Sequence, residues 1–164
     1  MTAPTPMIVP VKRHIESHLL DINPANGYVY TITADQILGI KKDLTVDGSA
    51  AGPNCCVYVT GFGKMQPGQD ANFGQILAIV HFALDFAINV QEEPDVEVLQ
   101  AAADFERNIK QDYSQGSTCK NTTSPDLLLF GFDMSGWFHG SLTWDCLVPW
   151  GENDPYHEFS TTYN

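Results

Sequence analysis

Residues Ile76 to Val90 alternate between apolar and mixed side chains, and this pattern constrains the fold more than any other in the chain. Every second position is apolar: Ile76, Ala78, Val80, Phe82, Leu84, Phe86, Ile88 and Val90. A period of two predicts a β-strand with one buried face and one partly covered face. At about 3.3 Å per residue the strand would be about 50 Å long, which is more than a small domain covers by itself. We therefore expect it to bend, to contain a bulge, or to pack on another subunit.

The N-terminal region changes from a helical to a strand period across one short turn. Its first apolar residues recur at gaps of three and four, which places them on one helical face: Ile8, Val11, Ile15, Leu19 and Ile22. Asn23-Pro24 ends this helix, and Asn26-Gly27 supplies residues that accept a positive φ. The alternation from Tyr28 to Ile32 then predicts a half-buried strand.

The remaining elements are predicted from the same two periods. We expect a strand over Cys56 to Phe62, a helix from Pro94 to Asp112, and strands over Leu127 to Met134 and Ser141 to Trp150, the last two joined by Ser135 to Gly140. The helix has an apolar stripe made of Val98, Ala102, Phe105, Ile109 and Tyr113. The stretch from Ala34 to Leu44 fits either a short strand or a turn of helix.

This order of elements predicts an α+β fold in two layers. The sheet is mixed but mainly antiparallel, and two helices pack on one of its faces. At 164 residues and 43% hydrophobic composition, the chain suits one domain with a real core. We assign residues 1–150 to that domain and residues 151–164 to a C-terminal arm or tail.

The charge balance argues against binding by neutralisation of many phosphates. Eight basic residues stand against twenty acidic ones, for a formal net charge of −12. Anionic lipid and the DNA backbone would both repel such a chain. The residues before Ile8 resemble no signal peptide, and Ile76 to Val90 is too short and too polar for a membrane helix. We expect a soluble protein with no membrane partner, whose four cysteines are free thiols.

The order of elements resembles the tail terminator, or tail completion, proteins of tailed bacteriophages. The resemblance rests on the N-terminal helix and the Pro-Ala-Asn-Gly-Tyr turn, the strand that follows the turn, the hydrophobic strand that ends at a loop, the long strand, the helix after Pro-Asp and the closing strand near a proline. In this sequence these are Ile15 to Asp21, Pro24 to Tyr28, Cys56 to Gly61, Ile76 to Val90, Pro94 to Asp112, and Leu142 to Pro149. Most of the chain is covered by element order, without an invariant motif. The polar loop from Ser114 to Pro125 and the aromatic pair Trp137-Phe138 depart from the pattern.

The resemblance implies a structural virion protein without catalytic activity or cofactor. Such a protein forms a ring, usually of six copies, at the head-proximal end of the tail tube. The ring would stop tube polymerisation and join the tail to the head connector, so that the tube protein and the connector protein are its partners. Genomic DNA would pass through the lumen without specific binding, which suits an acidic protein. The protein would be assembled in the host cytoplasm and reside in the tail or neck of the virion.

Residues for assembly contacts are expected in two loops. The loop from Gly61 to Gly74 and the aromatic turn at Trp137-Phe138 would offer exposed side chains to a neighbouring subunit. The candidate interface residues are Phe62, Lys64, Met65, Gln66, Phe73, Trp137 and Phe138. The aromatic pair can equally fold back on its own domain.

Motifs for chemistry are weak. His14 and His18 are one helical turn apart, but no third ligand is marked, so we predict no metal site. Gly61-Phe62-Gly63-Lys64 lacks the first glycine and the Ser or Thr of a phosphate loop. Asp133 and Asp145 could pair across a hairpin as acid and base, but solvated carboxylates on strands are the commoner case.

Two functions of different classes therefore stay open. The first is the phage ring protein, or another neck or head-completion protein. The second is a small α+β binding or enzymatic domain whose site is scattered in sequence, with His81, Asp85 and His139 as candidates. The mass of the protein in solution would separate them.

Overall fold

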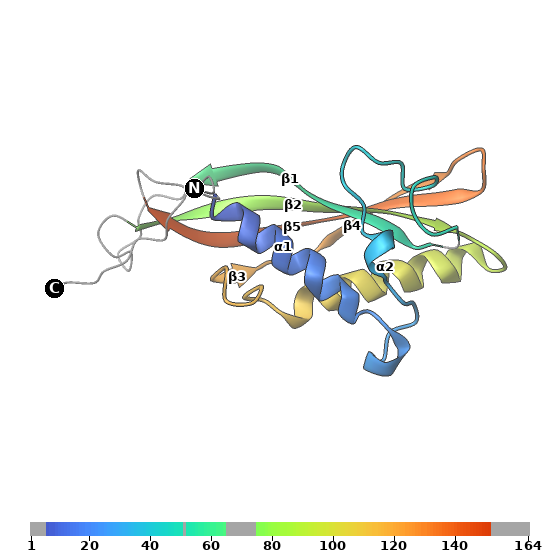
Figure 1. Ribbon diagram of the computed structural model, residues 1–164, viewed down its shortest axis with the longest axis horizontal. Helices are drawn as coiled ribbons and strands as arrows, with labels where there is room; N and C mark the ends of the chain where they lie inside the picture. Colours follow the sequence, from blue (N-terminus) through green and yellow to red (C-terminus); the bar gives the residue numbers. More distant parts are fainter. Residues whose placement is uncertain (1–5, 51, 65–74, 152–164) are drawn as a thin grey trace.

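The computed structural model describes residues 6–50, 52–64 and 75–151, without the side chains of residues 64, 75, 76, 150 and 151. It contains two helices and a five-stranded antiparallel sheet: α1 Ile8–His18, β1 Asn54–Lys64, β2 Gln75–Asn89, α2 Pro94–Gln111, β3 Asn121–Thr122, β4 Asp126–Phe132 and β5 Trp137–Gly151. Both helices lie on the same side of the sheet (Figure 1). The predicted α+β class with two layers is confirmed.

The sheet is built around two long strands of equal length. β2 and β5 pair without interruption, from Gln75 opposite Gly151 to Asn89 opposite Trp137. β1 pairs with the other side of β2, while β3 and β4 both pair with β5. The length of β2 is thus covered within the chain, because β5 begins at Trp137 rather than at the expected Ser141. The predicted connection from Ser135 to Gly140 was too long.

The core lies between the helices and the sheet. The predicted apolar register of β2 is confirmed, since Ala78, Val80, Phe82, Leu84, Phe86 and Ile88 are all buried. From α1 the core receives Val11 and Ile15, followed by Leu19 and Ile22 beyond the end of the helix. The predicted helical face is therefore correct, although the helix ends at His18 and continues as a 3₁₀ turn over Leu19–Asp21.

Helix α2 presents its expected stripe to the sheet. Val98, Ala102, Phe105 and Ile109 are buried, and the Phe105 ring lies 5.5 Å from the Phe86 ring. Tyr113 is the exception, because α2 ends at Gln111 and Tyr113 is exposed. At the other end, the Glu97 carboxylate accepts the N–H groups of residues 91, 92 and 93, which satisfies donors in front of the helix.

The predicted strand from Tyr28 to Ile32 does not form. The alternation of burial is present, since Tyr28 and Ile32 are buried and Val29 is exposed. However, the N–H groups of Val29 and Tyr30 donate to the Asp104 carboxylate of α2, at 2.9 and 2.8 Å. A side chain thus takes the place of a neighbouring strand.

The stretch from Ala34 to Leu44 combines both predicted alternatives on a small scale. It forms a 3₁₀ turn over Ala34–Gln36, followed by a single parallel bridge between Ile37 and Cys55. The segment after it is held by the buried side-chain amide of Asn54. This amide donates hydrogen bonds to the carbonyl groups of Leu44 and Ser49 and accepts one from the Ser49 N–H.

Candidate functional site

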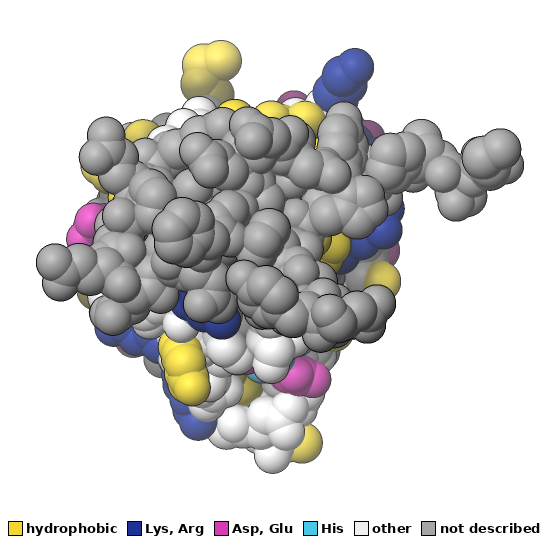
Figure 2. Space-filling model, turned by 90° about the vertical axis from the view of Figure 1, so that its left-hand side faces the viewer, with side chains coloured by type: hydrophobic (Ala, Val, Ile, Leu, Met, Phe, Trp, Pro, Cys, Tyr) yellow, Lys and Arg dark blue, Asp and Glu magenta, His cyan; other side chains and the backbone are white. Residues whose placement is uncertain are grey.

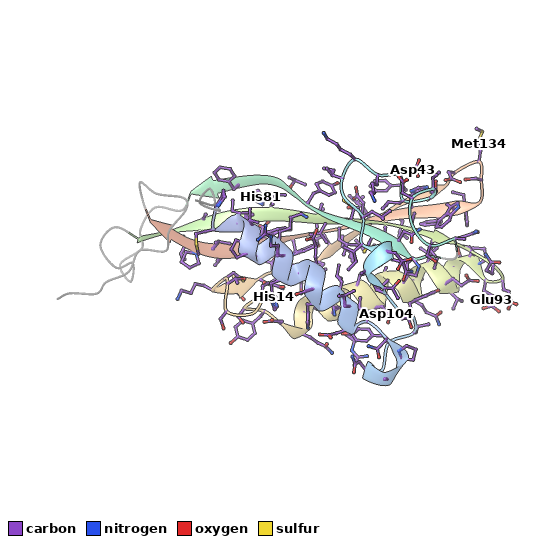
Figure 3. All side chains as sticks on the ribbon, viewed as in Figure 1. His14, Asp43, His81, Glu93, Asp104 and Met134 are labelled. Atoms are coloured by element: carbon purple, nitrogen blue, oxygen red, sulfur yellow. The ribbon has the colours of Figure 1, made fainter. Side chains whose placement is uncertain are left out.

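The side of the sheet that faces away from the helices carries a row of polar pairs, which we call the polar face. Tyr58 donates to Asp85 at 2.8 Å, and His81 Nδ1 lies 2.6 Å from Asp145. These pairs link neighbouring strands, because His81 is directly opposite Asp145 in the β2–β5 register. His81 alternates along β2 with the core residues Val80 and Phe82, whereas His14 lies on α1, on the helix side (Figure 3). The polar face is thus distinct from the helix-covered face.

The His81–Asp145 pair borders a cleft of about 300 Å³. Its lining is mostly polar, with Thr60, Thr123, Asp126 and Thr143 beside the pair. Two of these hydroxyls are engaged by the sheet itself: Thr60 donates to the His81 carbonyl, and Thr123 accepts the Asp145 N–H. A His–Asp pair of this kind can hold or pass a proton, but no activated Ser or Cys nucleophile lines the described part of the cleft.

Tyr58 is poorly suited to proton transfer near neutral pH. Burial, followed by its hydrogen bond to Asp85, raises the pKa of Tyr58 to about 12. The hydroxyl therefore stays protonated and acts as a donor to the carboxylate.

A third polar pair organises the turn between β4 and β5. His139 Nε2 lies 3.0 Å from Asp133, which also accepts hydrogen bonds from Ser135 and from the Trp137 N–H. The hydrogen bond with His139 and those with Ser135 and Trp137 hold the pKa of Asp133 well below its ordinary value. Figure 3 places Asp43 near this hairpin, whose tip carries Met134. The pair therefore has a structural role in the turn.

The carboxylates and histidines proposed for chemistry are not brought together. Asp133 serves the β4–β5 turn, whereas Asp145 lies farther along β5 and pairs with His81. Asp133 and Asp145 therefore do not pair as acid and base, and both are partly exposed carboxylates, as in the commoner case. His81, Asp85 and His139 share the polar face, but each contacts a different partner.

On the helix side, His14 and His18 stack with ring centroids 5.9 Å apart. Each ring approaches a different carboxylate, since His14 Nε2 lies 2.9 Å from Asp112 and His18 Nε2 lies 3.6 Å from Asp21. Burial pushes the pKa of Asp112 upward, but hydrogen bonds from Gly116, Ser114 and His14 outweigh it and the net shift is downward. Within the described ranges, no group of three His, Cys, Asp or Glu side chains could hold a metal ion.

The four cysteines are free and buried. Cys119 and Cys146 lie on either side of the Thr122 hydroxyl, at 3.5 and 3.6 Å. A hydrogen bond from the Cys146 thiol lowers the pKa of Cys119, and the same contact raises the pKa of Cys146. Burial raises the pKa of Cys55 and Cys56. Cys119 is therefore the thiol that ionises first among the four.

The candidate interface residues have different surroundings. Phe62 is 57% exposed on β1, but Trp137 is only 6% exposed, so of the two alternatives for this ring the structure shows packing within its own domain. Phe138 is half-buried and packs edge-on against Phe132, with centroids 5.0 Å apart. Met65, Gln66, Phe73 and the Lys64 side chain lie outside the described residues. Gly61-Phe62-Gly63-Lys64, compared above with a phosphate loop, belongs to strand β1.

Sequence reasoning missed the main apolar surface of the described part of the chain. Strand β4 and the turn after it expose six large apolar residues, which we call the β4 patch: Leu127, Leu128, Leu129, Phe130, Phe132 and Met134. The signal was an apolar run without alternation, which indicates apolar side chains on both faces of a strand. Inside a sheet such a strand is buried, but β4 pairs only with β5 among the described strands. It is an edge strand with apolar side chains on both faces.

Figure 2 views the molecule from the end where β1 and β5 terminate. The described charged side chains visible there carry both signs, so this view singles out no purely acidic surface. Among the described helices, none is long and apolar enough to cross a membrane. No protein-family model and no curated protein matches the chain.

Proposed function

We propose that this protein is a structural component of the virion of a tailed bacteriophage. It forms a ring at the head-proximal end of the tail tube, where it terminates tube polymerisation and joins the tail to the head connector. The tube protein and the connector protein are its partners, and DNA passes through the lumen without specific binding. The ring contains no catalytic site.

The observation that carries this proposal is the β4 patch. Monomeric soluble proteins rarely leave a contiguous apolar surface of this kind open to water, and such surfaces mark protein contacts. The patch lies on a sheet edge, where an assembly contact can use both side chains and backbone. An edge contact repeated around an axis gives a closed ring.

Two further features support the proposal. The elements on which the resemblance rests follow one another in the chain as helix, turn, β1, β2, α2 and β5. The predicted strand from Tyr28, which the resemblance also includes, does not form and lends the proposal no support. The net charge of −12 disfavours tight contacts with phosphates, as a DNA channel requires.

The test is the mass of the full chain in solution, measured by size-exclusion chromatography with light scattering over a range of concentrations. A hexamer, or a mixture of monomer and ring that shifts with concentration, is expected. Negative-stain images should then show particles with a central opening. A strict monomer at the highest attainable concentration would refute the ring.

The polar face favours one alternative, a small binding or enzymatic domain. The observation behind it is the cleft at His81 and Asp145, which combines a His–Asp pair with several hydroxyls. A monomer that binds a small polar ligand, and loses that binding in His81→Ala, would favour this alternative over the ring.

A further inference from the structure

The β4 patch lacks the features that usually protect a sheet edge from pairing. Natural edge strands carry charged residues or proline, whereas residues 127–132 contain neither. The exposed fractions within the patch run from 38% for Leu127 to 107% for Met134. Asp126 and Asp133 flank the apolar run on its two sides. The edge is therefore suited to pairing with another strand.

The area of the patch is close to what a stable interface needs. With about 200 Å² for the full surface of a large apolar residue, the exposed parts of the six residues amount to roughly 700 Å². A standard protein interface buries about 800 Å² on each partner. The patch could therefore form most of one side of such an interface, provided that the partner covers both faces and the edge of β4.

Among the described strands, β1 forms the second edge of the same sheet, on the side opposite to β4. Of the described strands, β1 pairs only with β2, and the bridge to Ile37 covers only its beginning, at Cys55. From Val57 onward this edge bears the half-buried Tyr58 and Val59 and the exposed Phe62. No acidic residue occurs between Asn54 and Lys64. Figure 1 shows β1 and β4 on either side of the β2–β5 pair.

We propose that the β4 edge of one copy of this chain pairs with the β1 edge of the next copy. The sheets of neighbouring copies would then be continuous, and the β4 patch would be covered by apolar residues around Phe62. The pairing is heterologous, which closes a ring when the rotation between copies allows it. This inference rests on the proposed ring, since it names the surfaces by which the ring closes.

Charge favours β1 over a second β4 as the occupant. If two β4 strands paired in antiparallel fashion about their apolar centre, Asp126 of one copy would lie opposite Asp133 of the other. Like charges directly opposite each other destabilise a strand pair. The β1 edge brings no carboxylate to β4, and this matters in a chain whose copies already repel one another.

The test uses full-length variants, each with a lysine on one edge. Phe130→Lys, with Leu128→Lys as a second variant, blocks the β4 edge, and Phe62→Lys blocks the β1 edge. Leu99→Lys is the matched control, because Leu99 is 53% exposed and lies on α2, outside both edges. Circular dichroism and thermal melts identify variants that remain folded. Light scattering then gives the mass of each variant alone and in equimolar mixture.

The three edge variants should be monomers, whereas Leu99→Lys should assemble like the wild type. Mixing a β4 variant with Phe62→Lys should give a dimer with one copy of each, because this pair retains one intact β4–β1 contact. Both β4 variants assembling normally would overturn the inference and leave the ring proposal standing. Normal assembly of Phe62→Lys, or a mixture that stays monomeric, would show that β4 does not pair with β1. A monomeric wild type would overturn the inference and the ring together.

Discussion

Replacing Asp104 by alanine should destabilise the fold more than any other single change to an acidic side chain on α2. The Asp104 side chain is 7% exposed, and one of its oxygens accepts the N–H groups of both Val29 and Tyr30. Alanine removes both hydrogen bonds at once. It leaves two backbone donors in a partly buried segment that has no neighbouring strand.

The expected loss can be estimated from these two bonds. A hydrogen bond to a charged group contributes about 1.5–3 kcal/mol, and access of water to the exposed Val29 keeps the total at the lower end. We therefore expect Asp104→Ala to lower the free energy of unfolding by about 3 kcal/mol. Asp104→Asn keeps an oxygen in place but loses its charge, so its cost should be about 1 kcal/mol.

Urea denaturation at a fixed protein concentration measures both values. The control is Glu106→Ala, which removes an exposed ion pair with Lys110 and should change the free energy of unfolding by no more than about 0.5 kcal/mol. Amide exchange at Val29 and Tyr30 should become faster in Asp104→Ala. If Asp104→Ala matched Glu106→Ala, the segment from Tyr28 to Ile32 would be held by something other than this carboxylate.

Three further predictions concern the core, the β4–β5 turn and the buried thiols. Gly140→Ala should lower the free energy of unfolding by about 1–3 kcal/mol in urea melts, because the new Cβ would lie 2.5 Å from the buried Phe86 ring. Asp133→Asn should lower the melting temperature most at pH 7, and its effect should shrink steadily as the pH falls below 3.8. The folded pKa of Asp133 lies below its ordinary 3.8, so its stabilisation is complete above about pH 5 and is lost as the pH falls through the folded pKa. When the pH is raised, thiolate absorbance should appear before the pH reaches 9.0, the ordinary pKa of a thiol. This early signal should be absent in Cys119→Ser.

Each of these predictions has a control in the same chain. Gly63→Ala introduces a Cβ with no atom within 4 Å. If it lowered the free energy of unfolding as much as Gly140→Ala does, a steric clash could not explain the effect of Gly140→Ala. Asp47→Asn removes an exposed carboxylate from another loop, and an equal pH dependence there would argue against a special role of Asp133. Cys56→Ser should keep the early thiolate signal, because burial raises the pKa of Cys56.

The helices and the long strand could be predicted because their signals are local. The face of α1 and the apolar register of β2 follow from side-chain periods of 3.6 and 2 residues, which any buried helix or strand must show. The same reasoning failed for Tyr28 to Ile32. Its alternation predicted burial correctly, but a strand also needs a hydrogen-bonding neighbour, and here the Asp104 carboxylate accepts these bonds.

The candidate site was harder to predict than the fold. For Trp137 the sequence left open an exposed turn position or packing within its own domain, and only the structure shows that β5 begins at this residue and that the ring is buried. The β4 patch was not singled out, because an apolar run gives no sign of whether its strand lies inside a sheet or at its edge. The pairing of His81 with Asp145 depends on the register of two strands that are more than sixty residues apart.

The sequence by itself determined which segments are helical or extended and which of their faces are apolar, because these properties follow from neighbours along the chain. It also determined the acidic charge that disfavours binding to nucleic acid. Only the tertiary structure decided the order of the strands, the full-length pairing of β2 with β5, and the edge position of β4. Those features depend on contacts between residues that are distant in sequence, and such contacts leave no local period. The apolar edge on which the assembly proposal rests is therefore visible only in the folded chain.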